Sequence, residues 1–384
     1  MRAGWIRTGW VYPGFLLALL LAGPARADTL PPIAVHYLGD LIGDVSGGRE
    51  RGASLIHRLD VAIATGDRMF GIDGLHAQAD VMLLQGGGFS ARRSGDYQMV
   101  SNIDAPHALR PYEAWVEAQI GAQGRAKAGL IDLNGAFDQQ AVGGLFLNSS
   151  FGIGPDLSQS GPDGPSIFPV TAPGVVLTWQ PPGSIARIGL FDARAGDPDH
   201  PHRAFPDSFG RNGALLIGEG RTQIGPSVAV QAGLWTYTDR APRIDGSGRG
   251  TSAGAYALIE ARLAGGEEGR ALRSWLRIGH AADATNAIET YVGGGVTWGS
   301  SAASCGIAVA HAREGDPARR VGAVDGHEAE RAETAIEATA RWHVAGGLAL
   351  QPDVQYVIHP GWNPAYRDAL VVGLRVDWTV LIAR

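Results

Sequence analysis

The chain has 384 residues and a formal net charge of −6 at pH 7, which argues against a nucleic-acid-binding protein. Charged residues make up 18% of the chain. That share is well below the roughly 25% of an average soluble domain, so much of the surface is predicted to face something other than water. The single cysteine, Cys305, excludes an internal disulfide.

The first 27 residues have the pattern of a secretory signal peptide. Arg2 and Arg7 precede an apolar run over residues 15–21, and Ala25-Arg26-Ala27 follows as a cleavage site. Cleavage there would remove three arginines and bring the net charge from −6 to −9. Nothing after residue 27 offers about 18 consecutive apolar residues, the length that a transmembrane helix needs. We therefore expect an exported protein with a single domain at residues 28–384.

Short segments along this domain alternate between apolar and polar side chains, as strands with two unlike faces do. In chain order they span residues 76–83, 112–120, 272–278, 334–344, 348–358 and 369–380. In the segment 112–120, the apolar face is predicted to hold Tyr112, Ala114, Val116, Ala118 and Ile120. In the last segment, Leu370, Val372, Leu374, Val376, Trp378 and Val380 form one apolar face, and the opposite face carries Arg375 and Asp377.

Longer stretches rich in glycine, proline and polar residues separate these segments. They cover residues 152–174, 194–213, 242–252 and 313–333, and the longer ones are predicted to be extracellular loops. Asp197, Asp199, His200 and His202 could suggest a metal site, but proline-interrupted loop residues without a further cluster are more often solvated. We expect neither a metal nor another cofactor.

Alternation alone fits either a soluble β-sandwich or a membrane β-barrel. Segments of about ten residues suit a tilted crossing of the hydrocarbon layer, and the low charge content also favours the barrel. At about 20–24 residues for a strand with its connection, residues 28–384 would form about 16 strands, enough to leave an aqueous channel. We predict an all-β fold: a closed, transmembrane, antiparallel up-and-down barrel with a water-filled lumen. Aromatic residues near the segment ends are predicted to form interfacial girdles, namely Tyr112, Trp298, Trp342, Tyr356 and Trp378.

Five stretches resemble the carbohydrate-selective outer-membrane porins of the OprB-type family. They lie at residues 35–52, 101–121, 129–152, 274–299 and 351–376, in the order found in the family. The blocks GLFLNSSFG and QPDVQYVIHP are the most specific. The resemblance implies a 16-stranded barrel that lets monosaccharides and related neutral solutes diffuse passively across the outer membrane. It also implies no enzymatic activity.

A sugar-selective pore needs charge-assisted hydrogen bonds to hydroxyl pairs and an apolar platform for the sugar ring. The phase of the strands predicts these lumen residues: Glu113, Trp115, Glu117, Arg273, Arg277, Glu337, Arg341, Asp353, Arg375 and Asp377. Asp40, Asp44, Arg49 and Arg51 are further eyelet candidates, because they lie in the segment most like the family's first strand. The alternative for each residue is a wall ion pair that never contacts solute. Charges of both signs argue against a strong anion or cation channel.

Three other functions are alternatives to a sugar-selective porin. A general, weakly selective diffusion porin fits the same barrel, and a secreted soluble β-protein would dissolve without detergent. A barrel lipase would need a serine or histidine nucleophile pair. The expected partners are small sugars, outer-membrane lipid, lipopolysaccharide and the outer-membrane assembly machinery. A homotrimer is one allowed assembly, but no interface can be read from the sequence.

Overall fold

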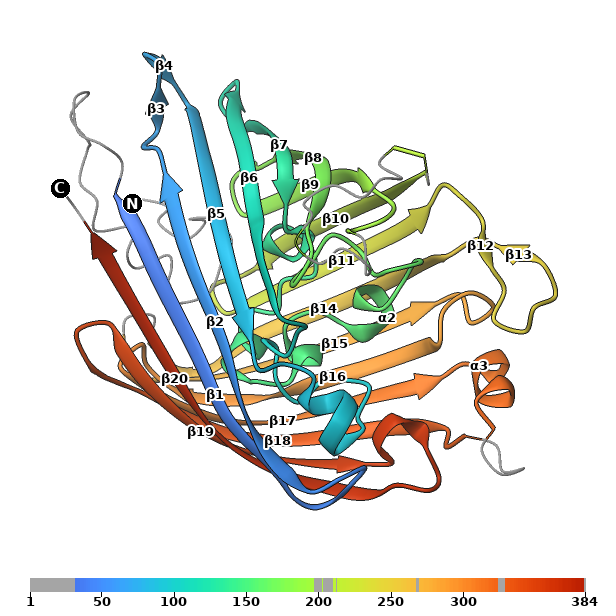
Figure 1. Ribbon diagram of the computed structural model, residues 1–384. Helices are drawn as coiled ribbons and strands as arrows, with labels where there is room; N and C mark the ends of the chain where they lie inside the picture. Colours follow the sequence, from blue (N-terminus) through green and yellow to red (C-terminus); the bar gives the residue numbers. More distant parts are fainter. Residues whose placement is uncertain are drawn as a thin grey trace.

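The protein is a closed β-barrel of sixteen antiparallel strands, as the sequence predicted (Figure 1). The structure, a computed structural model, describes residues 32–196, 202, 210–211, 213–266, 269–323 and 329–382. The predicted signal peptide lies outside these residues. The barrel strands are β1 (Ile33–Gly48), β2 (Gly52–Ala64), β5 (Leu75–Gln85), β6 (Ala108–Ile120), β7 (Gly124–Ile131), β8 (Ala172–Trp179), β9 (Ser184–Asp192), β10 (Ala214–Ile224), β11 (Val228–Tyr237), β14 (Ala253–Gly265), β15 (Ala271–Ala281), β16 (Ile288–Gly299), β17 (Ala303–Glu314), β18 (Ala332–Ala345), β19 (Leu348–Ile358) and β20 (Arg367–Ile382).

Short elements lie in the connections between these strands. They are β3 (Arg68–Met69), β4 (Ile72–Asp73), β12 (Ala241–Pro242), β13 (Arg249–Gly250), η1 (Ser90–Ser94), η2 (Leu133–Gly135), η3 (Gly143–Leu145), η4 (Ser149–Phe151), α2 (Pro155–Ser158), α3 (Asp316–Val321) and η5 (Pro360–Trp362). None of the described helices is long and apolar enough to span a bilayer.

The barrel closes where its first strand pairs with its last. The register of β1 with β20 runs from Ile33 opposite Ile382 to Gly48 opposite Arg367. Every other barrel strand pairs with its neighbours in chain order, so no described barrel strand has a free edge. In lipid this closure is required, because an unpaired strand edge would leave backbone N–H and C=O groups without partners.

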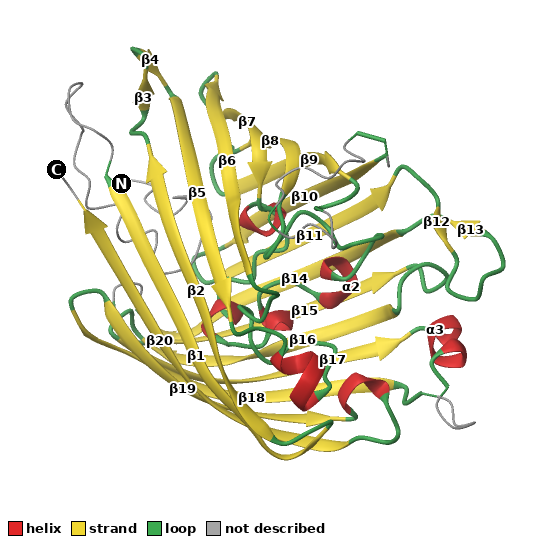
Figure 2. Ribbon diagram, viewed as in Figure 1, coloured by secondary structure: helices red, strands yellow, loops and turns green. Residues whose placement is uncertain are grey.

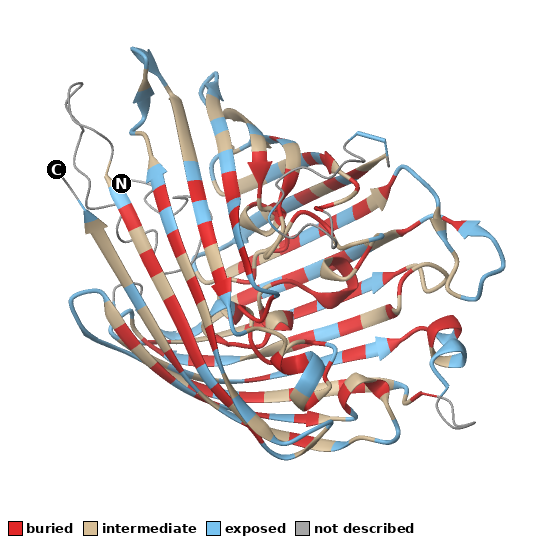
Figure 3. Ribbon diagram, viewed as in Figure 1, coloured by how far each residue is buried: buried red, intermediate tan, exposed pale blue. Residues whose placement is uncertain are grey.

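Burial alternates along the strands, and Figure 3 shows it as stripes of buried and exposed residues. In β19 the outward Val354 and Tyr356 are exposed, whereas Asp353 and Gln355 are buried inside the barrel. In β20 the outward Leu374 and Trp378 are exposed, and Arg375 is buried. The alternation is the one that a strand between lipid and an interior requires.

The predicted outward face is wrong at Tyr112. The pairing of β5 with β6 shifts between Asp80 and Val81, which places an extra residue in β6 at this point. Tyr112 is therefore buried, and its hydroxyl donates a hydrogen bond of 2.6 Å to Asp132. The other residues assigned to an aromatic girdle are exposed on the outer wall: Trp298, Trp342, Tyr356 and Trp378.

The two ends of the barrel differ. The start of β1 and the end of β20 lie at the same end (Figure 1), together with short turns such as residues 121–123 and 346–347. The long connections lie at the opposite end, which we expect to be extracellular. Two of them fold back into the barrel, where Figure 2 shows their short helices inside the ring of strands. We name residues 86–107 the first inward segment and residues 132–171 the second inward segment.

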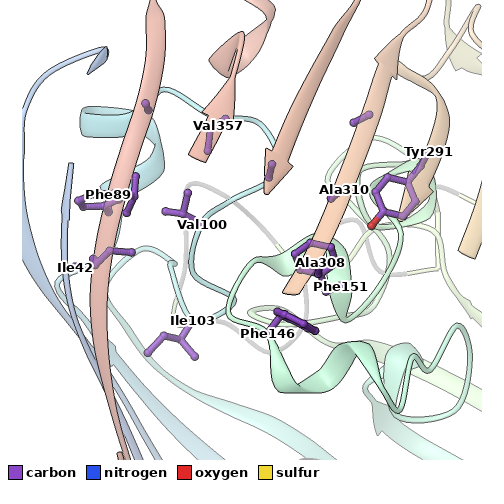
Figure 4. Packing of buried hydrophobic residues seen from close by; sticks show 14 of the residues in the cluster. Ile42, Phe89, Val100, Ile103, Phe146, Phe151, Tyr291, Ala308, Ala310 and Val357 are labelled. Atoms are coloured by element: carbon purple, nitrogen blue, oxygen red, sulfur yellow. The ribbon is translucent and has the colours of Figure 1, made fainter. Parts of the chain in front are cut away.

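The interior is a packed core as well as a channel. Phe89, Val100 and Ile103 of the first inward segment and Phe146 and Phe151 of the second are almost fully buried. They belong to one cluster with inward-facing wall residues, among them Ile42, Ala308, Ala310 and Val357 (Figure 4). Part of the inner wall is thus apolar, because it packs against the inward segments and not against water.

Candidate solute channel

A cavity of about 1870 Å³ separates the two inward segments from parts of the barrel wall. Its amide side chains are Gln98, Asn102, Gln119, Gln123, Asn134, Gln139, Gln140, Gln159, Gln180, Gln223, Gln231 and Gln351. Arg187, Arg221, Arg273, Arg341 and Arg375 of the wall also line it. Because amides and guanidinium groups hydrogen-bond to hydroxyls without needing an ion as partner, this lining suits a neutral polar solute.

Wall carboxylates fasten the second inward segment at successive points. Asp132 N donates to Glu113 (3.0 Å), Asp138 N to Glu219 (2.7 Å) and Val142 N to Glu260 (2.8 Å). Farther along, Glu337 accepts hydrogen bonds from Leu147 N (2.6 Å) and Asn148 N (2.9 Å). These acceptors come from β6, β10, β14 and β18, so the segment is tied around much of the wall. Each bond satisfies a backbone N–H that would otherwise be buried without a partner.

A buried arginine holds the same segment at its centre. Arg277 of β15 donates to both oxygens of Asp138 (3.0 and 2.8 Å) and also pairs with Asp156. All three side chains are inaccessible to solvent. The rings of Tyr256 and Tyr291 lie 5.0 and 5.3 Å from the guanidinium carbon. One guanidinium thus bonds to two carboxyl groups in a place that water cannot reach.

Gly154 and Gly279 leave the room for this cluster, and we expect an added methyl group at Gly279 to disrupt it. A Cβ on Gly279 would overlap the carboxylate of Asp156 and the guanidinium of Arg277. Overpacking of this kind costs about 1–3 kcal/mol. We expect Gly279→Ala to lower the temperature at which the folded, heat-modifiable band converts on a gel. Gly220→Ala is the matched control, because nothing lies within 4 Å of a Cβ at that position. Equal conversion temperatures for both variants would contradict the prediction.

The first inward segment is fastened mainly by β1, β18, β19 and β20. Arg375 pairs with Asp40 through two bonds of 2.7 Å, and it also donates to Asn102 (2.8 Å). Asp40 in turn accepts a hydrogen bond from the Ser101 hydroxyl (2.6 Å). Glu333 accepts the N–H groups of Tyr97 and Gln98 (2.8 and 2.9 Å), and Gln355 donates to the carbonyl of Val100 (2.7 Å).

Burial raises the pKa of carboxyl groups in both inward segments. It raises the pKa of Asp132 above its ordinary value, although the hydrogen bond from the Tyr112 hydroxyl opposes the rise. Burial also raises the pKa of Asp96, and the hydrogen bond from Ser94 opposes it there. Of the two, Asp132 also lines the cavity.

Comparison with known proteins decides the family of the chain. The family model described as "Carbohydrate-selective porin, OprB family" matches residues 64–380. The chain belongs to this family. A sequence comparison with curated proteins gave no match.

Solved structures show the same fold at low sequence identity. The high pH structure of Pseudomonas putida OprB is 16% identical, with a TM-score of 0.81, over 92% of this chain and 95% of that one. The low pH structure of the same protein is 13% identical, with a TM-score of 0.56, over 91% and 92%. A mutant of Rh. blastica porin is 15% identical, with a TM-score of 0.51, over 90% and 99%.

In this OprB-family porin, the residues predicted from the sequence lie in three places. The first group is buried behind the inward segments and consists of Asp40, Glu113, Arg277, Glu337, Asp353 and Arg375. Of these, Asp353 accepts a bond from Gln355 (2.9 Å), and the others bond the inward segments directly. Arg375 also lines the cavity.

The second group lies in the half of the porin nearer the chain termini. Arg273, Arg341 and Asp377 line the cavity, and Arg341 pairs with Asp377 at 2.7 Å. Glu117 lies 3.1 Å from His76. Lys127 lies 4.0 Å above the ring of Trp115, so that this face of the indole is already covered.

The third group lies at the end of the barrel with the long connections. Asp44 is buried and accepts a hydrogen bond from Ser46 N (3.1 Å). Arg49 and Arg51 are exposed in the turn between β1 and β2. Arg49 donates to the carbonyl of Ala91 (3.1 Å), which ties this turn to the first inward segment.

A row of charged and amide side chains on β9, β10, β11 and β14 was not among the predicted residues. Arg187 pairs with Glu219 (3.5 Å), Arg221 with Glu260 (2.8 Å), and Gln231 joins Arg221 to Glu219 through bonds of 3.1 and 2.8 Å. Alternation over residues 184–192 and 214–224 was the signal that could have found them. The lining amides of the inward segments carry no such periodic signal.

The described residues contain no group of three or more histidine, cysteine or acidic side chains that could hold a metal ion. Of the four loop residues considered for a metal site, Asp197, Asp199 and His200 lie outside the described part of the chain. His202 lies near Leu109, whose N–H donates to it at 3.2 Å.

Proposed function

We propose that this porin is a passive channel for monosaccharides and similar neutral solutes across the outer membrane. The observation that carries the proposal is the cavity between the firmly tied inward segments and the barrel wall, lined by amides and by arginines. Arg187, Arg221, Arg341 and Arg375 each have a carboxylate partner. Paired charges offer hydrogen bonds to hydroxyls while exerting little net attraction on an ion.

The orientation of the channel in the membrane follows from the proposed location, and net flux follows the concentration gradient of the solute. Export through a signal peptide at residues 1–27 would deliver residues 28–384 to the outer membrane as one barrel domain. The long connections would then face the medium and the short turns the periplasm. Solute would pass the inward segments and leave by the end at which the chain termini lie. Outer-membrane lipid, lipopolysaccharide and the assembly machinery would be its partners there.

Passive diffusion predicts selectivity by hydrogen bonding and size, without catalysis. Purified protein in liposomes is expected to raise the influx of glucose or arabinose above that of an amino acid of similar size. The measurement is the swelling rate in isotonic solute, with protein-free liposomes as the baseline. Equal rates for the sugars and the amino acid would contradict sugar selectivity.

A general, weakly selective diffusion porin is the second candidate. It is favoured by the covered face of Trp115, because a sugar would need a free aromatic surface for stacking. Such a pore would discriminate by size alone. It predicts equal swelling rates for the sugars and for the amino acid of similar size. In a series of pentoses, hexoses and disaccharides, the swelling rates would follow solute radius only.

A further inference from the structure

Five arginines gather at the end of the barrel with the long connections, where the turn between β1 and β2 meets η1 and the start of β20. The residues that meet there are 47–51, 86–95 and 359–367, and Glu50 is the one acidic residue among them. Four of the arginines are exposed, and Arg93 is half-buried. We name these five residues the arginine rim: Arg49, Arg51, Arg92, Arg93 and Arg367.

Backbone contacts hold the members of the arginine rim together. Arg49 N donates to the carbonyl of Arg93 (2.7 Å), and the Arg93 guanidinium donates to the carbonyl of Arg51 (3.2 Å). The register of β1 with β20 places Arg367 opposite Gly48. The turn, η1 and β20 thus bring their guanidinium groups to one patch of the surface, although like charges repel one another.

Few carboxylates offset the charge of the arginine rim. The carboxylate of Glu50 pairs with Arg93. Two further members donate to backbone carbonyls at 3.1 and 2.9 Å, and a carbonyl carries no formal charge. Arg51 and Arg367 form no hydrogen bond or ion pair with the residues that the structure describes. The rim therefore has guanidinium groups free to bind an anion from outside.

The other acidic side chains packed against the arginine rim are buried or already bonded. Asp44, Asp96 and Asp104 are buried beneath it, and each accepts a hydrogen bond. Asp44 also lies close enough to Arg51 to attract it. Asp368 accepts two hydrogen bonds, from a tyrosine hydroxyl (2.9 Å) and from a backbone N–H (3.1 Å). At the exposed surface of the rim, positive charge is therefore in excess.

The arginine rim lies away from the channel and above a lipid-facing wall. None of its five members lines the cavity. Below the turn, the outer faces of β1, β2 and β20 carry exposed apolar side chains, namely Leu41, Val45, Leu55, Val372 and Leu374. The registers join them, because Leu41 lies opposite both Leu55 and Leu374. Guanidinium groups above an apolar wall match an amphiphile with phosphate in its headgroup, because phosphate accepts paired bonds from arginine and acyl chains can pack on the wall.

We propose that the arginine rim binds the phosphate groups of a glycolipid in the outer leaflet, whose acyl chains lie along the outer wall of β1, β2 and β20. This inference rests on the outer-membrane location in the proposed function. A soluble phosphate compound offers the same negative charge, but it would leave the apolar wall without a partner. The lipid is therefore the occupant that uses both parts of the surface.

The experiment measures the affinity of the purified porin, in nonionic detergent, for diphosphoryl lipid A by native mass spectrometry. We expect Arg51→Gln combined with Arg367→Gln to weaken binding about three- to tenfold, because two exposed charges are lost. Arg51→Lys combined with Arg367→Lys keeps both charges and should retain most of the affinity. The matched control, Arg211→Gln combined with Arg320→Gln, removes two exposed arginines from the same end of the barrel but outside the rim, and should leave the affinity unchanged.

Four results would overturn the lipid site. They are an unchanged affinity in the double glutamine variant of the rim, an equal loss in the matched control, an equal affinity for dephosphorylated lipid A, and displacement of lipid A by equimolar inorganic phosphate. The last result would assign the rim to a soluble anion. If the double variant does not fold, the comparison of phosphorylated with dephosphorylated lipid A on the unmodified porin still decides.

Liposome swelling in glucose separates this proposal from the proposed function. Because no member of the arginine rim lines the cavity, the double glutamine variant should pass glucose at the rate of the unmodified porin. An unmodified porin that binds lipid A but passes no glucose would contradict the proposed function alone. One that passes glucose but does not bind lipid A would contradict the lipid site alone.

Discussion

Arg277→Leu is expected to free the second inward segment from the barrel wall and to widen the channel. The substitution leaves Asp138 and Asp156 buried without their cation, and breaking such a pair costs about 3–5 kcal/mol. The segment would relieve this cost by moving its carboxylates into water. We expect a higher single-channel conductance with more current noise, and a lower temperature of band conversion on a gel.

The matched control removes the charges of Arg277, Asp138 and Asp156 together. Arg277→Leu combined with Asp138→Asn and Asp156→Asn has no buried ion, and neutral amides can still accept a bond such as the one from Gly154 N to Asp138 (2.9 Å). Replacing a whole buried ion cluster is often close to neutral for stability, so the triple variant should recover most of the thermal stability. A single variant with unchanged conductance and stability would show that Arg277 does not hold the segment.

Glu337→Ala is expected to weaken the discrimination between monosaccharides and disaccharides. Glu337 accepts two backbone N–H groups of the second inward segment, and each buried donor left without a partner costs about 1–3 kcal/mol. The turn at Leu147 and Asn148 would then shift from the wall. Because Leu145, Ser149 and Ser150 nearby line the cavity, its bore would change. The measurement is the ratio of glucose to disaccharide swelling rates, which should fall.

Two further variants test whether the change in this ratio depends on the acceptor oxygens of Glu337. Glu337→Gln keeps one acceptor oxygen and should give an intermediate ratio. Glu289→Ala removes a carboxylate that pairs with Arg313 at 3.6 Å, and it should leave the ratio unchanged. A ratio in Glu337→Ala equal to that of the unmodified porin would mean that the other ties suffice to hold the segment.

Both predictions concern wall charges that do not contact solute directly. Arg277 and Glu337 were selected from the sequence as lumen residues, and the structure places both of them behind the second inward segment. Their influence on solute is therefore exerted through the position of this segment. Arg273, Arg341, Arg375 and Asp377 line the cavity itself and are the predicted residues able to contact solute there.

The barrel could be predicted from the sequence because the alternation of apolar and polar side chains along a strand is a local and periodic pattern. Each strand lies between lipid and an interior, and this requirement repeats every second residue, as along β19 and β20. The predicted outward position is wrong at Tyr112, because an added residue in β6 reverses which side chains of the strand point outward. A bulge of this kind depends on pairing with the next strand, and hydropathy along one strand does not record it.

The channel could be predicted only in part, because its bore depends on contacts between residues far apart in the chain. The bond that Leu147 N donates to Glu337 and the bond that Gln355 donates to the carbonyl of Val100 join residues 190 and 255 positions apart. Alternation along the strands is enough to predict that charged side chains such as Arg277 and Asp353 point into the barrel. Which of these side chains face the cavity and which bond a buried segment depends on the folded chain, because a charged side chain inside a barrel can be satisfied equally well by water or by a folded-in backbone.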